Sequence, residues 1–366
     1  MVRLLVFLGV LLAFLLALPG AHQDLKADCP SAPLPIAIKS PGCFRLTGDY
    51  TIQDAGQWAI NVESPNVLVD LDGHTINGPG PTSTASGIYA AESPGIVLRG
   101  GTIKGFLFGA RVENTSGSIE VRDMAFSGGA RGIVMRGDAV LAVRNSFSNM
   151  QGYSGWPAAH TIAIETFSTT CRIEQNSISE IYPFSTGEIV AISLSAPVED
   201  CVVTGNRIVN SDRPEVAGRG IAFWLDGTQR PGGARISDNI VEGYDYAFMS
   251  AEQARSAFVS NRFVVTCLPG EVTTYSGGLH NDFLRFGSEC RDTLPYLRRM
   301  ASKGDPEWSI RLAVAMMEFQ DGVPDDAVRC ERLRESMHLL TPLMSMPQAQ
   351  EQMRRVESIN ARCPEP

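Results

Sequence analysis

Short segments in which apolar and polar residues alternate recur along most of this sequence. Alternation with a period of two predicts β-strands that bury one face. Each of these segments ends near a polar residue or a glycine. They cover residues 67–76, 96–103, 119–126, 141–147, 171–178, 201–208, 234–241 and 257–264.

The polar or glycine positions at the ends of these segments form a regular column. Successive members lie 28, 23, 22, 31, 30, 33 and 22 residues apart. In a stack of coils, such side chains would lie above one another at the inter-strand spacing of about 4.8 Å, where asparagines can form a hydrogen-bonded ladder. The column consists of Asp72, Gly100, Asp123, Asn145, Asn176, Asn206, Asn239 and Asn261.

A second set of short strands lies between most of these segments, at residues 87–91, 109–113, 132–136, 161–165, 190–193 and 220–224. Two or three strands in each period, with no long helix between them, are what one coil of a parallel β-solenoid requires. The predicted fold class is therefore an all-β solenoid, a right-handed parallel β-helix of about eight coils, with a small α-helical segment at the carboxyl end.

The eight cysteines indicate an oxidising compartment, where an even number usually means disulfides. Cys171 and Cys201 each lie five residues before an asparagine of the column, so they should stack in adjacent coils within reach of a disulfide. No C-x-x-C motif occurs, so no zinc site is predicted. Proximity in the sequence suggests the remaining pairs: Cys29 with Cys43, Cys267 with Cys290, and Cys330 with Cys363.

Both ends of the chain depart from the strand pattern. Residues 1–23 open with Arg3 and continue with an apolar run, the layout of a secretory signal peptide rather than of a membrane span. From Arg291 onward the spacing of apolar residues becomes helical. We therefore expect a signal peptide (1–23), a β-helix (24–290) and an α-helical tail (291–366) that packs on the last coil and covers its strand edge. The processed protein should be secreted or periplasmic, with no membrane span.

Two stretches resemble known families. The sequences "VLVDLDGHTINGPG" and "GIVLRGGTIKGFLFGARV", with the serial "N-x-I" turns, resemble the right-handed β-helix superfamily of pectate lyases and NosD-type periplasmic proteins, over residues 35 to about 265. The sequence "ASKGDPEWSIRLAVAMMEFQDGVPDD" is similar to one Sel1-like helical repeat. The first resemblance implies the fold but not the chemistry, because such folds host lyases, hydrolases, epimerases and isomerases. It also implies that His74 is a turn residue in an early coil, and that Asp70 and Asp72 are not calcium ligands.

The net charge of the chain limits the classes of binding partner that are expected. The formal net charge of −9 and the lack of a basic stripe argue against a nucleic-acid partner. The sequence predicts no cofactor and gives no support for calcium. A polysaccharide or another glycan is the expected partner, and the helical tail is an alternative docking module for a protein.

Chemistry is expected where the coils are longer than the shortest step. The extra residues fall at one turn, in 77–86, 148–160, 180–188 and 210–219, so the long loops should emerge on one side. Aromatic rings beside charged groups suit carbohydrate, because sugar C–H faces stack on rings. The loops carry Tyr153, Trp156, His160, Tyr182, Phe184, Arg213 and Arg219.

Strict alternation along the strand next to these loops predicts which side chains point outward. Third positions would be Tyr89, Arg111, Val134, Ala163, Ala191 and Ala222. Fifth positions would be Ala91, Glu113, Arg136, Glu165, Ser193 and Trp224. The fifth positions would then form a stripe of Glu113, Arg136 and Glu165 capped by Trp224. Two interpretations stay open, a surface ion-pair ladder and a substrate site.

The substrate-site interpretation favours β-elimination or epimerisation of a uronic-acid polymer. Arg136 or Arg111 would neutralise the substrate carboxylate, His160 would remove the proton, and Tyr153 or Tyr182 would donate to the leaving group. The predicted catalytic set is His160, Arg136 and Glu165. The predicted sugar contacts are Tyr89, Arg111, Glu113, Tyr153, Trp156, Tyr182 and Trp224.

Two functions therefore remain open. One is an exported β-helix protein that binds, and cleaves or epimerises, an acidic polysaccharide in a groove along one face. The other is a non-catalytic glycan-binding or envelope scaffold protein that uses the groove and the helical tail. The outward stripe lacks the aspartate cluster of the calcium-dependent lyases of the resembled superfamily, which puts classical pectate-lyase activity in doubt.

Overall fold

The computed structural model describes most of the chain between residues 29 and 285 and parts of the carboxyl-terminal region. The described residues are 29–53, 58–80, 82–113, 116–155, 160–183, 187–195, 198–210, 220–225, 233–250, 256–267, 280–285, 298, 301–304, 306, 309–310, 312–313, 316, 326–360 and 363. The predicted signal peptide, Trp156 and Cys290 lie outside them.

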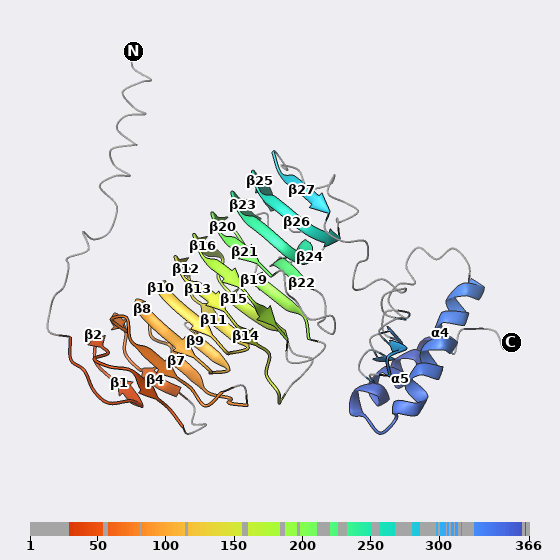
Figure 1. Cartoon of the computed structure of the whole chain (residues 1–366), viewed down its shortest axis with the longest axis horizontal. Coiled ribbons are helices and arrows are strands. Elements are labelled where there is room, and N and C mark those ends of the chain that lie inside the picture. The colour runs from red at the N-terminus through yellow and green to blue at the C-terminus, as the bar shows by residue number, and fades with distance from the viewer. Residues whose placement is uncertain are drawn as a thin grey trace, which may run out of the picture.

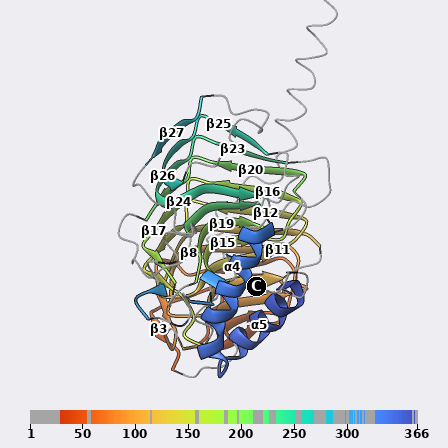
Figure 2. The ribbon, with the colours of Figure 1, turned by 90° about the vertical axis from the view of Figure 1, so that its right-hand side faces the viewer.

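The chain forms a parallel β-solenoid of about seven turns, slightly fewer than the eight coils that the sequence suggested (Figure 1). Each strand pairs in parallel with strands of neighbouring coils, so the strands lie in stacked layers when the solenoid is turned (Figure 2). Three stacks result, which we call faces A, B and C.

Face A begins each coil, and its strands run directly into those of face B in two places. Face A consists of β2 (Gly42–Arg45), β5 (Val67–Asp70), the first halves of β8 (Ile96–Lys104) and β10 (Ser118–Ser127), β12 (Ala139–Val143), β16 (Thr170–Glu174), β20 (Asp200–Thr204), β23 (Gly233–Ser237) and β25 (Ala257–Val259).

Face B follows the turn after face A. It consists of β3 (Tyr50–Thr51), β6 (Thr75–Asn77), the second halves of β8 and β10, β13 (Ser146–Ser148), β17 (Ser177–Ser179), β21 (Arg207–Val209), the start of β24 (Ile240–Ser250), β26 (Arg262–Cys267) and β27 (Asp282–Arg285).

Face C closes the coil and lies next to the long loops. It consists of β1 (Ile36–Ile38), β4 (Trp58–Val62), β7 (Ser86–Ala91), β9 (Phe108–Glu113), β11 (Arg131–Arg136), β15 (Thr161–Thr166), β19 (Ile189–Leu194), β22 (Gly220–Leu225) and the end of β24. Two further strands, β14 (Met150–Gln151) and β18 (Ile181–Tyr182), pair with each other in the loops.

An asparagine ladder fills the turn between faces A and B, as predicted. In each rung the side-chain oxygen accepts hydrogen bonds from the backbone and side-chain nitrogens of the asparagine one coil earlier, at 2.9–3.0 Å. The ladder consists of Asn145, Asn176, Asn206, Asn239, Asn261 and Asn281. It therefore runs one residue further than predicted, because Asn281 precedes β27.

The early members of the predicted column were assigned one or two positions too early in the chain. Met124, not Asp123, lies level with Asn145 and donates its backbone N–H to the Asn145 side chain at 3.2 Å. Gly100 and Asp123 stand one residue before the ladder position and Asp72 stands two before it, and the backbone takes a positive φ of 48° at Asp72, 60° at Gly100 and 54° at Asp123. Glycine, aspartate and asparagine tolerate this conformation better than most residues do.

One continuous hydrophobic core fills the solenoid, and the cysteines of its centre are linked as predicted. Cys171 and Cys201 are in register on β16 and β20, are each 1% exposed and form a disulfide with a Cα–Cα distance of 4.3 Å. The Cys29–Cys43 disulfide is also confirmed. The predicted pairing of Cys267 with Cys290 involves a residue outside the described part of the chain.

The carboxyl-terminal region is helical. It contains α4 (Asp326–Leu340), a short 3-10 turn η1 (Thr341–Leu343) and α5 (Pro347–Asn360). The predicted Cys330–Cys363 disulfide is confirmed and lies within this region. The region has its own small apolar cluster around Leu333, Leu340 and Val356. The packing of this tail on the last coil stays a prediction. No described helix is both long and apolar enough to cross a membrane.

Candidate functional site

Strict alternation fails on face C, which changes the set of outward side chains. Ala163, Ala191 and Ala222 were predicted to point outward, but each is fully buried and belongs to the core together with the residue that follows it. Two consecutive inward residues occur in these strands, so the outward position moves. The small side chains reflect a lack of room, since a Cβ atom at the equivalent Gly132 would lie 2.4 Å from a backbone oxygen of β15.

The residues in register on face C define a different outward row, which we call the central row. Parallel pairing of successive strands aligns Glu165 with Val134 and Ser193. The full central row is Tyr89, Arg111, Val134, Glu165, Ser193 and Trp224. The predicted stripe of Glu113, Arg136 and Glu165 is therefore wrong, because Glu165 is not in line with the other two.

Arg111 and Glu113 form a closed unit at the amino-terminal part of face C. One Arg111 nitrogen lies 3.0 Å from both carboxylate oxygens of Glu113. The guanidinium also lies over two rings, at 5.0 Å from the ring centre of Phe108 and 5.9 Å from that of Tyr89. The charge of Arg111 is thus already compensated within the protein.

Arg131 and Glu165 form a second ion pair on face C. Glu165 is only 8% exposed, and Arg131 lies on the neighbouring strand β11. A buried carboxylate needs such a partner because an uncompensated buried charge costs several kcal/mol. The sequence placed Arg136 next to Glu165 and gave no sign of Arg131, whose side chain reaches Glu165 although the backbone register sets Arg131 level with Ile162.

Arg136 is placed differently from the other two arginines. It is exposed, and its guanidinium lies 4.8 Å from the ring centre of Phe167, which follows β15. The strand register places Glu113 beside it, yet no carboxylate of the described residues lies within ion-pair distance of Arg136. Face C therefore carries an arginine that is held by a ring and keeps its hydrogen-bond donors available.

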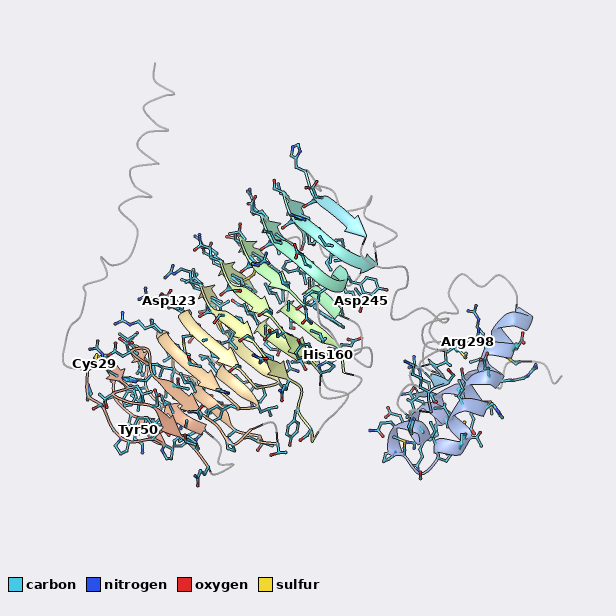
Figure 3. All side chains as sticks on the ribbon, in the orientation of Figure 1. Cys29, Tyr50, Asp123, His160, Asp245 and Arg298 are labelled. Carbon is cyan, nitrogen blue, oxygen red and sulfur yellow. A yellow bond between two sulfur atoms is a disulfide. The ribbon has the colours of Figure 1, made fainter. Side chains whose placement is uncertain are left out.

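His160 and Glu188 meet at the opposite edge of face C, where its strands begin. Thr161 and Ile189 are in register, so the residues just before them are neighbours as well. The Nδ1 atom of His160 lies 3.4 Å from the Oε2 atom of Glu188. The imidazole also makes an edge contact with Trp224, with ring centres 5.6 Å apart and planes at 73°. Figure 3 shows His160 beside the ends of the face C strands.

The two loops that contain β14 and β18 lie side by side, as predicted for them, and lead to His160 and Glu188. Tyr182 belongs to β18, and its backbone oxygen accepts a hydrogen bond from the Thr161 hydroxyl at 3.1 Å. The Tyr153 ring lies against Gly155, where an added Cβ atom would approach it to 2.5 Å. Both tyrosines thus lie in these two loops.

The predicted catalytic residues do not meet at one point. His160 precedes β15 and Phe167, which holds Arg136, follows it. Seven residues at about 3.3 Å each separate the two positions by roughly 23 Å. Glu165 lies between them and is engaged by Arg131. Their catalytic roles stay a prediction.

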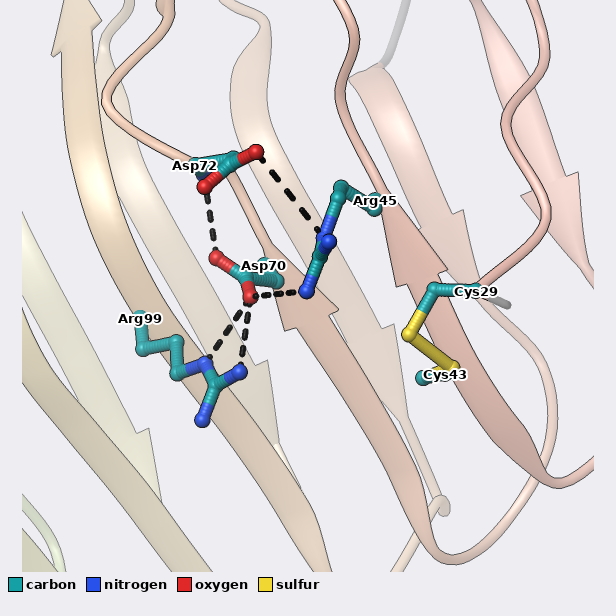
Figure 4. The surroundings of a disulfide bond; sticks show 6 residues. All are labelled: Cys29, Cys43, Arg45, Asp70, Asp72 and Arg99. Atoms are coloured by element: carbon teal, nitrogen blue, oxygen red, sulfur yellow. Dashed lines mark hydrogen bonds and ion pairs between the residues drawn. A yellow bond between two sulfur atoms is a disulfide. The ribbon is translucent and has the colours of Figure 1, made fainter. Parts of the chain in front are cut away.

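A second charged cluster lies on the first coils of face A, where Figure 4 shows Asp70 between two arginines. Its Oδ2 atom accepts hydrogen bonds from Nε and Nη2 of Arg99 at 3.0 and 2.8 Å, and Arg45 lies 3.5 Å away. Its other oxygen accepts the backbone N–H of Asp72 at 3.0 Å. Nearby, Asp49 pairs with His74 at 3.4 Å. These contacts hold the first turns together, and the described residues contain no group of three metal-ligating side chains.

Comparison with known proteins gives no family assignment. No family model matches the chain, and neither the curated proteins nor the solved structures yield a significant match. The structure itself defines the class, a disulfide-bonded parallel β-solenoid with a helical carboxyl-terminal region. The resemblances to pectate-lyase-like proteins and to Sel1 repeats stay predictions.

Proposed function

We propose that this protein is an exported β-solenoid that binds an acidic polysaccharide along face C, with Arg136 as its contact to an acidic group. The proposal depends mainly on the placement of Arg136 over the Phe167 ring without a carboxylate partner among the described residues. The first 23 residues and the disulfides favour export, because disulfides persist in oxidising compartments.

The chemistry of arginine supports this role. A guanidinium that stacks on a ring keeps its N–H donors in its own plane, where they match the two oxygens of a carboxylate or a sulfate. Stacking also limits the conformations of the side chain, so less entropy is lost when a ligand binds. Arg111 and Arg131 lack this freedom, since Glu113 and Glu165 already engage them.

Rings along the central row fit the sugar part of such a ligand. Tyr89 and Trp224 both point outward from face C and are partly exposed. An aromatic side chain offers a large apolar surface with a polar edge, which suits the mixed character of a sugar ring. The row runs along the solenoid axis, so a chain of several sugar units can contact successive coils.

The separation of His160 from Arg136 favours binding over turnover. A lyase or an epimerase needs a base and a carboxylate-neutralising cation on the same sugar unit. The estimated 23 Å between the positions that hold His160 and Arg136 is too long for one unit. We therefore propose binding as the primary function, with lyase or epimerase chemistry at His160 as the second candidate.

The test compares acidic and uncharged polymers on the purified protein by titration calorimetry. We expect binding of polyuronates, at least tenfold weaker binding after carboxyl reduction of the polymer, and a similar loss in the Arg136→Gln variant. Arg172→Gln is the matched control, since Arg172 is an exposed arginine on face A that pairs with Glu174 at 2.6 Å. Equal affinity of Arg136→Gln and wild type, or no binding of any acidic polymer, would contradict the proposal.

A further inference from the structure

Glu188 has a role at the candidate site that its sequence position does not suggest. We infer that Glu188 is a positioning residue that holds the His160 imidazole in the tautomer with hydrogen on Nδ1. The inference rests on the proposed function only in one respect, that the ligand facing Nε2 is a sugar hydroxyl of an acidic polysaccharide.

Backbone pairing alone places His160 and Glu188 next to each other. Thr161, which follows His160, donates its backbone N–H to the backbone oxygen of Glu188 at 2.9 Å. Parallel pairing then keeps the two strands, β15 and β19, in register along their length. The carboxylate and the imidazole therefore start from neighbouring positions immediately before two paired strands.

The burial of Glu188 favours a contact between its carboxylate and a hydrogen-bond donor. Glu188 is 8% exposed, so its carboxylate has lost most of its water and gains from a nearby donor. The imidazole atom that approaches Oε2 is Nδ1, at 3.4 Å. This distance is longer than an ordinary N–H···O bond, and such contacts in ligand-free sites commonly shorten when a ligand is bound.

Trp224 restricts the ring from a second direction. Its edge contact with His160 comes from β22, two strands away from β15 in the stack. A carboxylate at one nitrogen and a ring against one edge together limit rotation of the imidazole about its two side-chain bonds. The same Trp224 lies in the central row, so this arrangement connects the histidine to the proposed sugar-binding row.

The tautomer has a chemical consequence. In a neutral imidazole with hydrogen on Nδ1, the lone pair is on Nε2, which then acts as a hydrogen-bond acceptor. A sugar hydroxyl can donate to that nitrogen. The neighbouring carboxylate also stabilises the imidazolium ion whenever Nε2 takes up a proton, as an acidic orienting group does for other basic histidines.

The tautomer can be read directly, with no polymer present, from long-range proton–nitrogen NMR correlations of the histidine rings at a pH where they are neutral. The His160 signals are those lost in His160→Gln. We expect the Nδ1–H form in the wild type, a shift of population towards the Nε2–H form in Glu188→Leu, and retention of Nδ1–H in Glu188→Gln, whose side-chain oxygen can accept the same bond. Glu174→Leu, on face A, is the control and should leave the His160 signals unchanged.

An Nε2–H form in the wild type would overturn the inference without any variant, so a folding defect in Glu188→Leu cannot hide the answer. An unchanged tautomer in a folded Glu188→Leu protein would overturn it as well. Absence of polysaccharide binding would contradict the proposed function but would leave this result readable. If both hold, Glu188→Leu should weaken polyuronate binding several-fold, and Glu188→Gln should restore most of the loss.

Discussion

Replacement of the central ladder residue Asn206 by alanine should cost far more stability than a polar-to-alanine change normally does. Asn206 is 1% exposed. Its Oδ1 atom accepts hydrogen bonds from the backbone and side-chain nitrogens of Asn176, both at 2.9 Å. Its Nδ2 atom donates to the Ile173 backbone oxygen and to Asn239 Oδ1, both at 2.9 Å. The substitution removes these four bonds and a longer one from Nδ2 to the Thr204 backbone oxygen at 3.2 Å.

The size of the expected loss in stability depends on the buried polar groups that remain without a partner. The two Asn176 donors and the Ile173 oxygen lose a partner in the interior, where water cannot replace it. A hydrogen bond contributes about 1 kcal/mol net, and a buried polar group left without its partner costs about 1–3 kcal/mol. We therefore expect Asn206→Ala to lower the free energy of unfolding by about 4 kcal/mol.

The last rung provides a matched control within the same ladder. Asn281 is only half-buried, accepts two bonds from Asn261 and donates one to the Phe258 oxygen. Solvent can replace part of what is lost there, so Asn281→Ala should cost about 1–2 kcal/mol. The residue type and the change are the same in the two variants, so the difference between them reports the greater burial of Asn206 and its larger number of hydrogen bonds.

Urea denaturation followed by circular dichroism gives the free energies, and amide hydrogen exchange at Asn176 reports the broken bond locally. Because solenoid stability is a sum over neighbouring coils, exchange data are needed in case the transition is not two-state. A cost of Asn206→Ala no greater than that of Asn281→Ala, or unchanged exchange at Asn176, would show that the buried ladder bonds do not stabilise the solenoid.

Three further predictions concern stability. Loss of the Cys171–Cys201 disulfide, which closes a separation of 30 residues, should lower the free energy of unfolding by about 3.6 kcal/mol in the chain-entropy model, measured by denaturation of the double alanine variant. Gly132→Ala should cost about 1–3 kcal/mol through overpacking, because its Cβ would lie within 2.5 Å of a backbone oxygen and a phenyl ring; an unchanged melting temperature would contradict this. Hydrogen bonding to Arg144 holds the pKa of Asp123 below its usual value, so its contribution is present above the unfolded pKa and is lost as the pH falls through the folded one. The pair is half-exposed, so Arg144→Gln should reduce this acid-dependent loss by less than about 1 kcal/mol.

The sequence predicted the features that repeat with the coil. Alternation identified the strands, the asparagines identified the turn between faces A and B, and equal distances to that turn identified the link between Cys171 and Cys201. These features follow from one period, and a period is visible without knowledge of the register. The early column was wrong by one or two residues because Asp123 is as plausible as asparagine in a turn, and only the pairing distinguishes the two positions.

The outward residues of face C could not be predicted by alternation alone. Two consecutive inward positions break the period of two, and the only hint in the sequence is the small side chain at Gly132, Ala163 and their equivalents. Once the register shifts, every ion-pair assignment on the face shifts with it. Pairing of Glu165 with Arg131, and of His160 with Glu188, depends on contacts between coils that a single sequence does not display.

The Cys171–Cys201 bond has a consequence for how the molecule can come apart. A stack whose rungs touch only their neighbours tends to fray from its two ends toward the middle. Cys171 lies on β16, which directly follows the strand β15 that carries Glu165 and begins after His160, and Cys201 lies on β20, which directly follows the strand β19 that begins after Glu188. Unfolding that starts at either end is therefore opposed by a covalent link next to the His160–Glu188 pair. The strands that this disulfide joins should be among the last to separate.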